Sequence, residues 1–166
     1  MMSTRDRTAT GLLLFFIACA FTLELYWLVH HSHLAQRHDF LARAFAFYGR
    51  GDRGYFDHVS TFEVGLESFH VLFTQVLHIF VLIGIFRRTL WRSILQLVVG
   101  SYVSYSTALY LLANHVSGYA EMPRHDLASF LIFYLPNLPW LLGNAWLAWD
   151  AGERITSAFR KVEAPV

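Results

Sequence analysis

Four long apolar stretches, separated by polar segments, dominate the chain. They cover residues 11–30, 62–86, 93–113 and 127–149. A helix rises about 1.5 Å per residue, so about 20 apolar residues can cross the hydrocarbon core of a bilayer. The pattern predicts an all-α protein, an integral membrane bundle of four transmembrane helices. We expect a single domain over residues 1–166, with its core at about 11–150 and a flexible tail at 156–166.

The connection between the first two stretches is long, whereas the others are short. It covers residues 31–60, and apolar residues recur at helical spacing over residues 39–48. We therefore expect a short amphipathic helix in this loop, lying on the bundle or capping it. Gly49, Gly51 and Gly54 predict a turn directly after it.

The composition is that of a membrane protein. Hydrophobic residues make up 55% of the chain and charged residues 15%, whereas about a quarter of the residues are charged in an average soluble domain. The formal net charge is +1. We expect a hydrophobic small molecule and membrane lipid as partners, and no nucleic acid. A homodimer is left open.

The distribution of positive charge predicts the orientation. Eight of the 13 Lys and Arg residues lie before the first stretch, in the link at residues 87–92, or after the fourth stretch. In a four-span protein these three regions share one side, and the positive-inside rule places that side in the cytoplasm. We therefore expect a multi-pass protein with both termini cytoplasmic. Its membrane would be the endoplasmic reticulum in a eukaryote or the plasma membrane in a bacterium.

Two acids interrupt the apolar stretches. Glu24 lies near the end of the first stretch and Glu67 near the start of the second, so helical rise places both roughly 9 Å below the same membrane surface. A carboxyl group inside a membrane is costly unless it is paired, hydrated or protonated, and it commonly marks a functional site. His70 shares a helix face with Glu67 because three residues separate them. Glu24, Glu67 and His70 are the candidate catalytic residues.

Other polar and aromatic residues are expected in the same layer. Thr107 and Asn137 lie at a similar depth in the third and fourth stretches, and aromatic residues surround them. Hydroxyl and amide groups in membranes also form hydrogen bonds between helices, which is the simpler interpretation for Ser104 and Thr107. The candidate substrate-binding residues are Tyr26, Trp27, Phe73, Tyr105, Thr107, Tyr110, Asn137 and Trp140.

Acids lined by aromatic rings suit carbocation chemistry. Two carboxyl groups in one site can differ in protonation, so that one donates a proton while the other accepts one. Aromatic faces stabilise a cation. This combination predicts a membrane isomerase that moves a carbon–carbon double bond without a cofactor. A membrane terpene cyclase would use the same groups, and a non-catalytic receptor would pair a buried acid with a cationic amine.

Histidines raise the alternative of a metal site. The chain has nine, and His30, His31, His33 and His38 are bunched. Membrane di-iron enzymes need several histidine boxes, whereas the remaining histidines are single and scattered. We therefore interpret the bunched histidines as interfacial and loop residues, and predict no metal.

Four segments occur in an order and spacing known from one family of membrane proteins. They are Glu24 in the first stretch; Tyr48-Gly-Arg-Gly-Asp52-Arg-Gly-Tyr55 followed by Glu67; Arg92-Ser-Ile-Leu-Gln-Leu-Val-Val through Tyr105, Leu109-Tyr110, His115 and Gly118; and Phe133-Tyr-Leu-Pro-Asn137-Leu-Pro-Trp140, continuing to Asp150. Together they resemble the emopamil-binding protein family of sterol Δ8–Δ7 isomerases and related sigma-type receptors. In that resemblance Glu24 fits a glutamate of the first helix, the second segment fits the loop and acid of the second helix, and the last two segments fit the third and fourth helices.

The resemblance implies a four-helix domain in which both glutamates transfer protons. It also implies that Asn137 and Trp140 line the ligand site. Several positions depart from the family pattern. Ala20 stands where the isomerases carry a histidine, and His70 stands where they carry a threonine. Gln75-Val76 replaces a Gly-Pro pair, and Val103 and Thr107 replace a glutamine and an aspartate. His70 is a candidate to replace the missing histidine from another helix. The leading hypothesis is that Glu67 protonates an alkene of a sterol or terpenoid, and that Glu24 or His70 removes a different proton.

Overall fold

The computed structural model describes residues 2–163, and no β-strand occurs within them. The first long helix extends from Thr4 to Gln36, with a kink at His33, whose backbone angles are not helical. It consists of α1 (Thr4–Cys19), a π-helical turn η1 (Ala20–Glu24), α2 (Leu25–His30) and a 3-10 turn η2 (His31–Gln36). Ser3 caps its start by accepting a hydrogen bond from the Asp6 amide at 3.1 Å.

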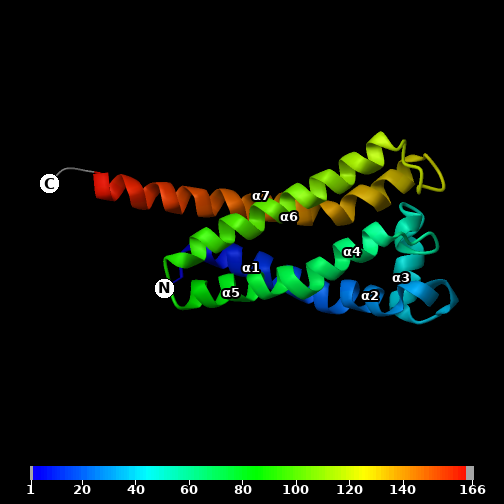
Figure 1. Cartoon of the computed structure of the whole chain (residues 1–166), viewed down its shortest axis with the longest axis horizontal. Helices are drawn as coiled ribbons and strands as arrows, with labels where there is room; N and C mark the ends of the chain where they lie inside the picture. The colour runs from blue at the N-terminus through cyan, green and yellow to red at the C-terminus, as the bar shows by residue number, and fades with distance from the viewer. Residues whose placement is uncertain (1, 164–166) are drawn as a thin grey trace.

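The predicted amphipathic helix in the first loop is present as α3 (Phe40–Tyr48). It begins at Asp39, whose carboxylate accepts a hydrogen bond from the Ala42 amide at 3.1 Å. A single 3-10 turn, η3 (Arg53–Tyr55), follows the glycine-rich segment. Figure 1 shows this loop closing one end of the bundle.

The second long helix runs from Thr61 to Phe86. Ser60 and Glu63 form a reciprocal capping box at its start, the arrangement that satisfies the free amides of a first turn. It contains α4 (Thr61–Phe69), a second π-helical turn η4 (His70–Thr74) and α5 (Gln75–Phe86).

The last two helices are the longest single elements, α6 (Trp91–Val116) and α7 (Leu127–Glu163). They form the most extensive helix pair, lying side by side in Figure 1. The approach is close because Gly100 of α6 has no side chain. A Cβ there would lie 2.7 Å from the Asn144 carbonyl oxygen, and small residues allow helices in membranes to approach in this way.

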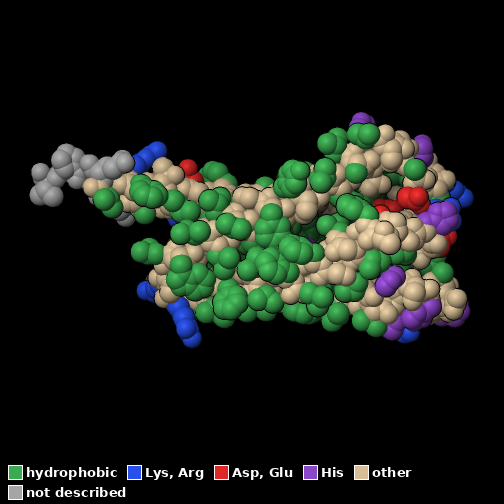
Figure 2. Space-filling model, viewed as in Figure 1, with side chains coloured by type: hydrophobic (Ala, Val, Ile, Leu, Met, Phe, Trp, Pro, Cys, Tyr) green, Lys and Arg blue, Asp and Glu red, His purple; other side chains and the backbone are tan. Residues whose placement is uncertain are grey.

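Three helices among residues 2–163 are long and apolar enough to cross a membrane: Thr4–Gln36, Thr61–Phe86 and Trp91–Val116. The predicted fourth, α7, is not among them, because Pro136, Asn137, Pro139 and Asn144 interrupt its apolar run. It is helical through residue 163, and residues 164–166, the end of the tail expected to be flexible, lie outside the described residues. Apolar side chains cover the middle of the visible face in Figure 2, and charged side chains collect at its ends.

Two apolar clusters form the core, one in each half of the bundle. One, from α1, α5, α6 and α7, includes Leu13, Phe16, Val81, Val99 and Leu147. The other lies under the first loop and includes Trp27, Leu34, Tyr55, Tyr110 and Phe133. The acids predicted at matched depth belong to the region between these clusters.

Candidate functional site

The two π-helical turns place the polar groups of the candidate site. Glu24 is the last residue of η1 and His70 the first residue of η4, and these two turns contact each other. A π turn contains one residue more than an α turn, which widens the helix locally and rotates the following side chains; such turns are frequent at functional sites. Both widened turns therefore occur where two neighbouring helices present Glu24 and His70 to each other.

Glu24, Glu67 and His70 form a compact cluster, which we call the acid cluster. One side-chain oxygen or nitrogen from each residue lies within 4.8 Å of those from the other two. His70 Nδ1 is 3.0 Å from Glu24 Oε2, and both side chains are largely buried. His70 thus reaches the first-helix acid from the neighbouring helix, whereas Ala20, the position of the histidine in the family pattern, is buried in η1.

Glu67 has a different partner. The Tyr55 hydroxyl donates a hydrogen bond to Glu67 Oε1 at 2.7 Å. The other oxygen, Oε2, is buried and has no hydrogen-bond partner within the described part of the chain, and the same is true of His70 Nε2. Buried polar atoms are nearly always hydrogen-bonded. Free positions on an acid and on an imidazole are therefore places at which a ligand can make contact or exchange a proton.

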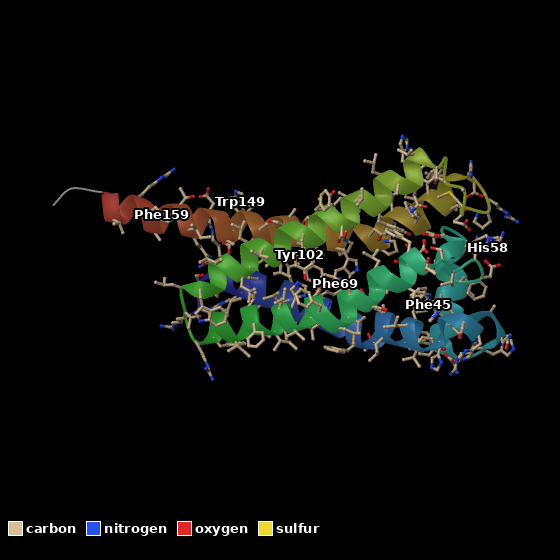
Figure 3. The ribbon with its side chains drawn as sticks, viewed as in Figure 1. Phe45, His58, Phe69, Tyr102, Trp149 and Phe159 are labelled. Carbon is tan, nitrogen blue, oxygen red and sulfur yellow. The ribbon has the colours of Figure 1, made fainter. Side chains whose placement is uncertain are left out.

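A cavity of about 730 Å³ lies beside the acid cluster. Its walls are mostly apolar and aromatic, which is typical of sites for small hydrophobic molecules. At one end Tyr48, Tyr55 and Tyr110 enclose it, and the Tyr48 hydroxyl accepts a hydrogen bond from Asn137 Nδ2 at 3.1 Å. Phe69 of α4 and Tyr102 of α6 also line it, and their rings, labelled in Figure 3, pack edge to face with centroids 6.0 Å apart.

Trp140 connects the cavity to the acid cluster. Its ring lies edge-on to His70, with ring centroids 4.6 Å apart, and it stacks on Phe16 at the same distance. Pro136 and Pro139 lie on the same helix and also line the cavity. The apolar packing of Phe16 thus fixes an indole ring next to the imidazole, where it can stabilise positive charge.

Seven of the residues expected at the site line this cavity, namely Glu24, Glu67, His70, Thr107, Tyr110, Asn137 and Trp140. Thr107 donates its hydroxyl hydrogen bond to the Val103 carbonyl of its own helix at 2.9 Å. This bond lies within α6 and does not join two helices, whereas Ser104 donates to the Leu141 carbonyl of α7 at 3.3 Å, as the interpretation of hydrogen bonds between helices expects. The remaining expected residues have other surroundings.

Tyr26, Trp27, Phe73 and Tyr105 do not line the cavity. Tyr26 donates a hydrogen bond to Asp39 at the start of α3, at 2.6 Å, and Trp27 is fully buried in the cluster under the loop. Phe73 is half exposed, and Tyr105 is 67% exposed on the outer face of α6. Counting residues gives the depth of each side chain, but it does not give the direction in which that side chain points.

Tyr48, Tyr55, Thr74 and Tyr102 line the cavity but are absent from the residues predicted for the site. Tyr48 is the last residue of α3, and Tyr55 lies in the turn after the glycines, where no spacing of apolar residues indicates which side chains turn inward. Tyr102 donates a hydrogen bond to Thr74 at 2.9 Å. The signal for Tyr102 was its position on α6, one residue before Val103 and on the helix face that includes Val99 and Val103, both of which are buried.

The acid cluster is also the group in the described chain whose geometry could hold a metal ion. Two carboxylates and one imidazole match the ligand types that divalent transition metals accept. The same three groups can transfer protons, so their chemistry alone is compatible with either use. The prediction of no metal remains a prediction.

Comparison with known proteins gives two matches. The sequence profile of EXPERA (EXPanded EBP superfamily) matches residues 40–151. A 3-beta-hydroxysteroid-Delta(8),Delta(7)-isomerase from Rattus norvegicus is 29% identical over 150 residues, which cover 88% of this chain. The match covers 65% of the rat protein, so the chain spans less than two thirds of the length of this relative. The profile match covers more than half of the chain and includes Glu67, His70, Asn137 and Trp140, whereas Glu24 lies before it.

Proposed function

Because this chain belongs to the EXPERA (EXPanded EBP superfamily) family, we propose that it is a membrane-embedded isomerase that moves a carbon–carbon double bond in a sterol. The observation that carries the proposal is the acid cluster at the wall of an apolar cavity. The rat relative, whose name specifies a sterol double-bond isomerase, supports the substrate class.

The proposed reaction adds one proton and removes another. Glu67 donates the proton of its free oxygen, Oε2, to one alkene carbon, and the π electrons form the new C–H bond. The adjacent carbon becomes a cation. The Glu24–His70 pair then accepts a proton from the neighbouring carbon, and the electrons of that C–H bond form the shifted double bond. The substrate gains and loses one proton, so its oxidation state does not change.

The contacts of the two acids support the roles proposed for them. Glu24 is bonded to His70 at 3.0 Å, which suits a base because the accepted proton can be shared between carboxylate and imidazole. Glu67 has an oxygen with no partner among the described residues, which suits an acid that presents a proton to an apolar carbon. Trp140, in edge contact with His70, would face the cationic intermediate.

The cavity supports a substrate of sterol size. Its volume of about 730 Å³ lies within the range of sites that bury most of a drug-sized ligand, about 300–1,000 Å³. Asn137 and Tyr48 supply polar groups at one wall, and the remainder is largely apolar. Such a lining would hold a rigid hydrocarbon skeleton and keep water away from the cation.

We also propose that α7 is the fourth span and that both termini are cytoplasmic. The extensive contact between α6 and α7 supports this arrangement. A helix that packs along a spanning helix lies at the same depth in the bilayer. Pro136, Asn137 and Pro139, which reduce the apolarity of α7, line the cavity, and Asn144 packs against Gly100 of α6. Lipid therefore does not need to solvate their polar groups.

Turnover in deuterated water tests the proposal. The purified chain, reconstituted in lipid nanodiscs and equilibrated in D₂O, should convert a Δ8-sterol to its Δ7 isomer. Early product should carry one new deuterium, seen by mass spectrometry and located by NMR. A shifted double bond without deuterium would contradict the protonation step.

Other outcomes would identify the alternative functions. A product with additional rings from a linear prenyl substrate would identify a cyclase. Binding of sterols or cationic amines without any turnover would identify a receptor.

A further inference from the structure

Tyr55 is a loop residue that reaches the candidate site from outside the long helices. It ends η3, and its hydroxyl contacts Glu67, twelve residues later in the chain. The side chain is 9% exposed. The proposed proton transfers assign it no role, although it makes the hydrogen bond that distinguishes the two oxygens of Glu67. A role for Tyr55 in the reaction rests on the proposed function of Glu67 as the acid.

The Tyr55 side chain is held on several sides by other rings. Its ring centroid lies 5.1 Å from that of Trp27, 5.5 Å from that of Tyr48 and 6.2 Å from that of Tyr110. Trp27 also donates its indole hydrogen to the Tyr55 carbonyl at 2.9 Å. A ring in such a cage has little freedom to rotate, so the position of its hydroxyl is set by the packing of the loop on α2 and α6.

The turn that carries Tyr55 is fixed as well. Asp52, which is 2% exposed, accepts hydrogen bonds from the Gly54 amide at 2.8 Å and from the Tyr110 hydroxyl. A Cβ on Gly54 would lie 2.9 Å from Asp52 Oδ1 and 3.1 Å from Glu63 Oε1, so the backbone must pass here without a side chain. The contacts of Asp52 thus connect α6 to the turn that positions Tyr55.

The structure assigns Tyr55 as the donor in its hydrogen bond to Glu67. Burial, and next the negative charge of Glu67, raise the pKa of Tyr55 well above its ordinary value. The phenol therefore keeps its hydrogen near neutral pH and has it available to donate to Glu67 Oε1, as the geometry shows. Glu67 Oε1 accepts that hydrogen bond, which leaves Oε2 as the oxygen that can carry the mobile proton.

We propose that Tyr55 is the positioning residue of Glu67: by donating to Oε1, it fixes the carboxyl plane and confines the transferable proton to Oε2. A carboxyl group that is free to rotate would present either oxygen, with or without the proton, to the substrate. Holding the acid in one orientation raises the rate of proton transfer without adding affinity for the substrate. Loss of the Tyr55 hydroxyl should therefore lower kcat and leave KM nearly unchanged.

The test compares Tyr55→Phe with Tyr105→Phe in nanodiscs. Both substitutions remove one phenol oxygen, but Tyr105 is largely exposed on the outer face of α6. We expect Tyr55→Phe to lower kcat by about 10- to 100-fold with KM within about two-fold, and Tyr105→Phe to leave both unchanged. A Tyr55→Phe protein with wild-type kcat would overturn the proposal, as would a rise in KM that accounts for the whole loss of kcat/KM.

An infrared measurement tests the same inference without turnover. The band of the protonated Glu67 carboxyl is assigned by its absence in Glu67→Gln. In Tyr55→Phe this band should move to higher frequency, because its carbonyl oxygen loses a hydrogen bond, whereas Tyr105→Phe should leave it in place. An unshifted band, or no Glu67-dependent band in the wild type, would overturn the inference.

The same measurement separates this inference from the proposed function. A shifted band in a chain that isomerises no sterol would retain the positioning role and refute the proposed function. A lower melting temperature without a band shift would show a structural role only.

Discussion

Two buried clusters of charged side chains lie in opposite halves of the bundle, and they are built differently. The acid cluster, Glu24, Glu67 and His70, lies beside the cavity in the half that the first loop closes. The second cluster, which we call the end network, contains Asp6, Arg92, Asp150 and Arg154 and joins α1, α6 and α7. Both occur within or beside long apolar helices, where an unpaired charge is costly.

In the end network each acid meets an arginine at short distance. Arg92 Nη2 lies 2.8 Å from Asp6 Oδ1, and Arg154 Nη2 lies 3.1 Å from the same oxygen. Asp150, which is fully buried, accepts from Arg154 Nε at 2.8 Å and from Gln96 Nε2 at 3.2 Å. Positive and negative groups are matched, and guanidinium groups remain charged at all relevant pH values.

In the acid cluster two carboxyl groups share one imidazole. The imidazole can gain or lose its proton near neutral pH, and the carboxyl groups need not both be charged at once. In the end network, buried acids that pair with arginines hold the helices together. In the acid cluster, where no arginine pairs with the acids, the carboxyl groups and the imidazole can exchange protons. The apolar cavity of about 730 Å³ lies at the unmatched cluster. Because the two clusters lie in opposite halves of the bundle and share no residue, substitutions in one should leave the other unaffected.

Removal of the acid of the candidate site should have the largest effect. We expect Glu67→Gln to lower turnover by about 10³-fold or more, because the amide cannot donate a proton to carbon, while the melting temperature changes little. Sterol isomerisation in nanodiscs, with thermal unfolding measured on the same sample, gives both quantities. Glu153→Gln, an exposed acid on α7, is the matched control. If Glu67→Gln retained more than a tenth of the wild-type turnover, the acid would have to be another group.

The opposite result is expected in the end network. Asp150→Ala should lower the free energy of unfolding by about 1–3 kcal/mol, because Arg154 and Gln96 each lose one partner and keep only Asp6 and the Leu147 carbonyl, respectively. Turnover per folded molecule should stay within about two-fold of the wild type. Denaturant titration in mild detergent measures the first quantity, with Glu153→Gln again as the control. A large loss of turnover in folded Asp150→Ala protein would mean that the two clusters are coupled.

Substitution of His70 should distinguish the group that accepts a proton from the group that donates one. We expect His70→Gln to lower turnover by about 10²-fold, less than the loss in Glu67→Gln, because Glu24 remains as an acceptor but loses its partner at 3.0 Å. The deuterium content of the product should be unchanged, since Glu67 still donates. A product with less deuterium would assign proton donation to His70 instead of Glu67.

An exposed charge cluster at the start of α3 should have the smallest effect. Hydrogen bonds from Tyr26, the Ala42 amide and Arg37 hold the pKa of Asp39 below its ordinary value of 3.8. A depressed pKa in the folded state gives stability that is fully present above the ordinary value and is lost as the pH falls below it. The melting temperature of the wild type should therefore exceed that of Asp39→Asn slightly at pH 7, and the difference should shrink progressively as the pH falls below 3.8. Asparagine caps helices about as well as aspartate, so a difference that does not shrink between pH 4 and pH 2 would have to come from packing.

The pattern of apolar residues predicts the helices well, because burial and hydrogen bonding in lipid leave few alternatives. The helix in the first loop and three candidate spans occur where the sequence predicts them. The fourth span stays a prediction, since prolines and amides on α7 weaken the apolar signal there. Glu24 and Glu67 could be placed at one depth by counting residues, because helical rise is constant.

Side-chain direction could not be predicted at the same level. Tyr105 was expected to line the site, yet it is exposed, whereas Tyr102 lines the cavity. Residues two positions apart on a helix differ in direction by about 200°, so Tyr105 points away from the face of Val103. The packing of α5 and α7 against α6 decides which face of α6 is buried, and this packing is known only from the assembled bundle.

The sequence by itself determined that this protein is helical, that it is apolar enough for a membrane, and that two acids lie at equal depth, because these properties depend on composition and on local periodicity. Only the tertiary structure decided that His70 meets Glu24 across two π turns and that Tyr55 holds Glu67 from the loop. Contacts between residues 46 or 12 positions apart depend on how the helices rotate and pack, which local spacing does not determine.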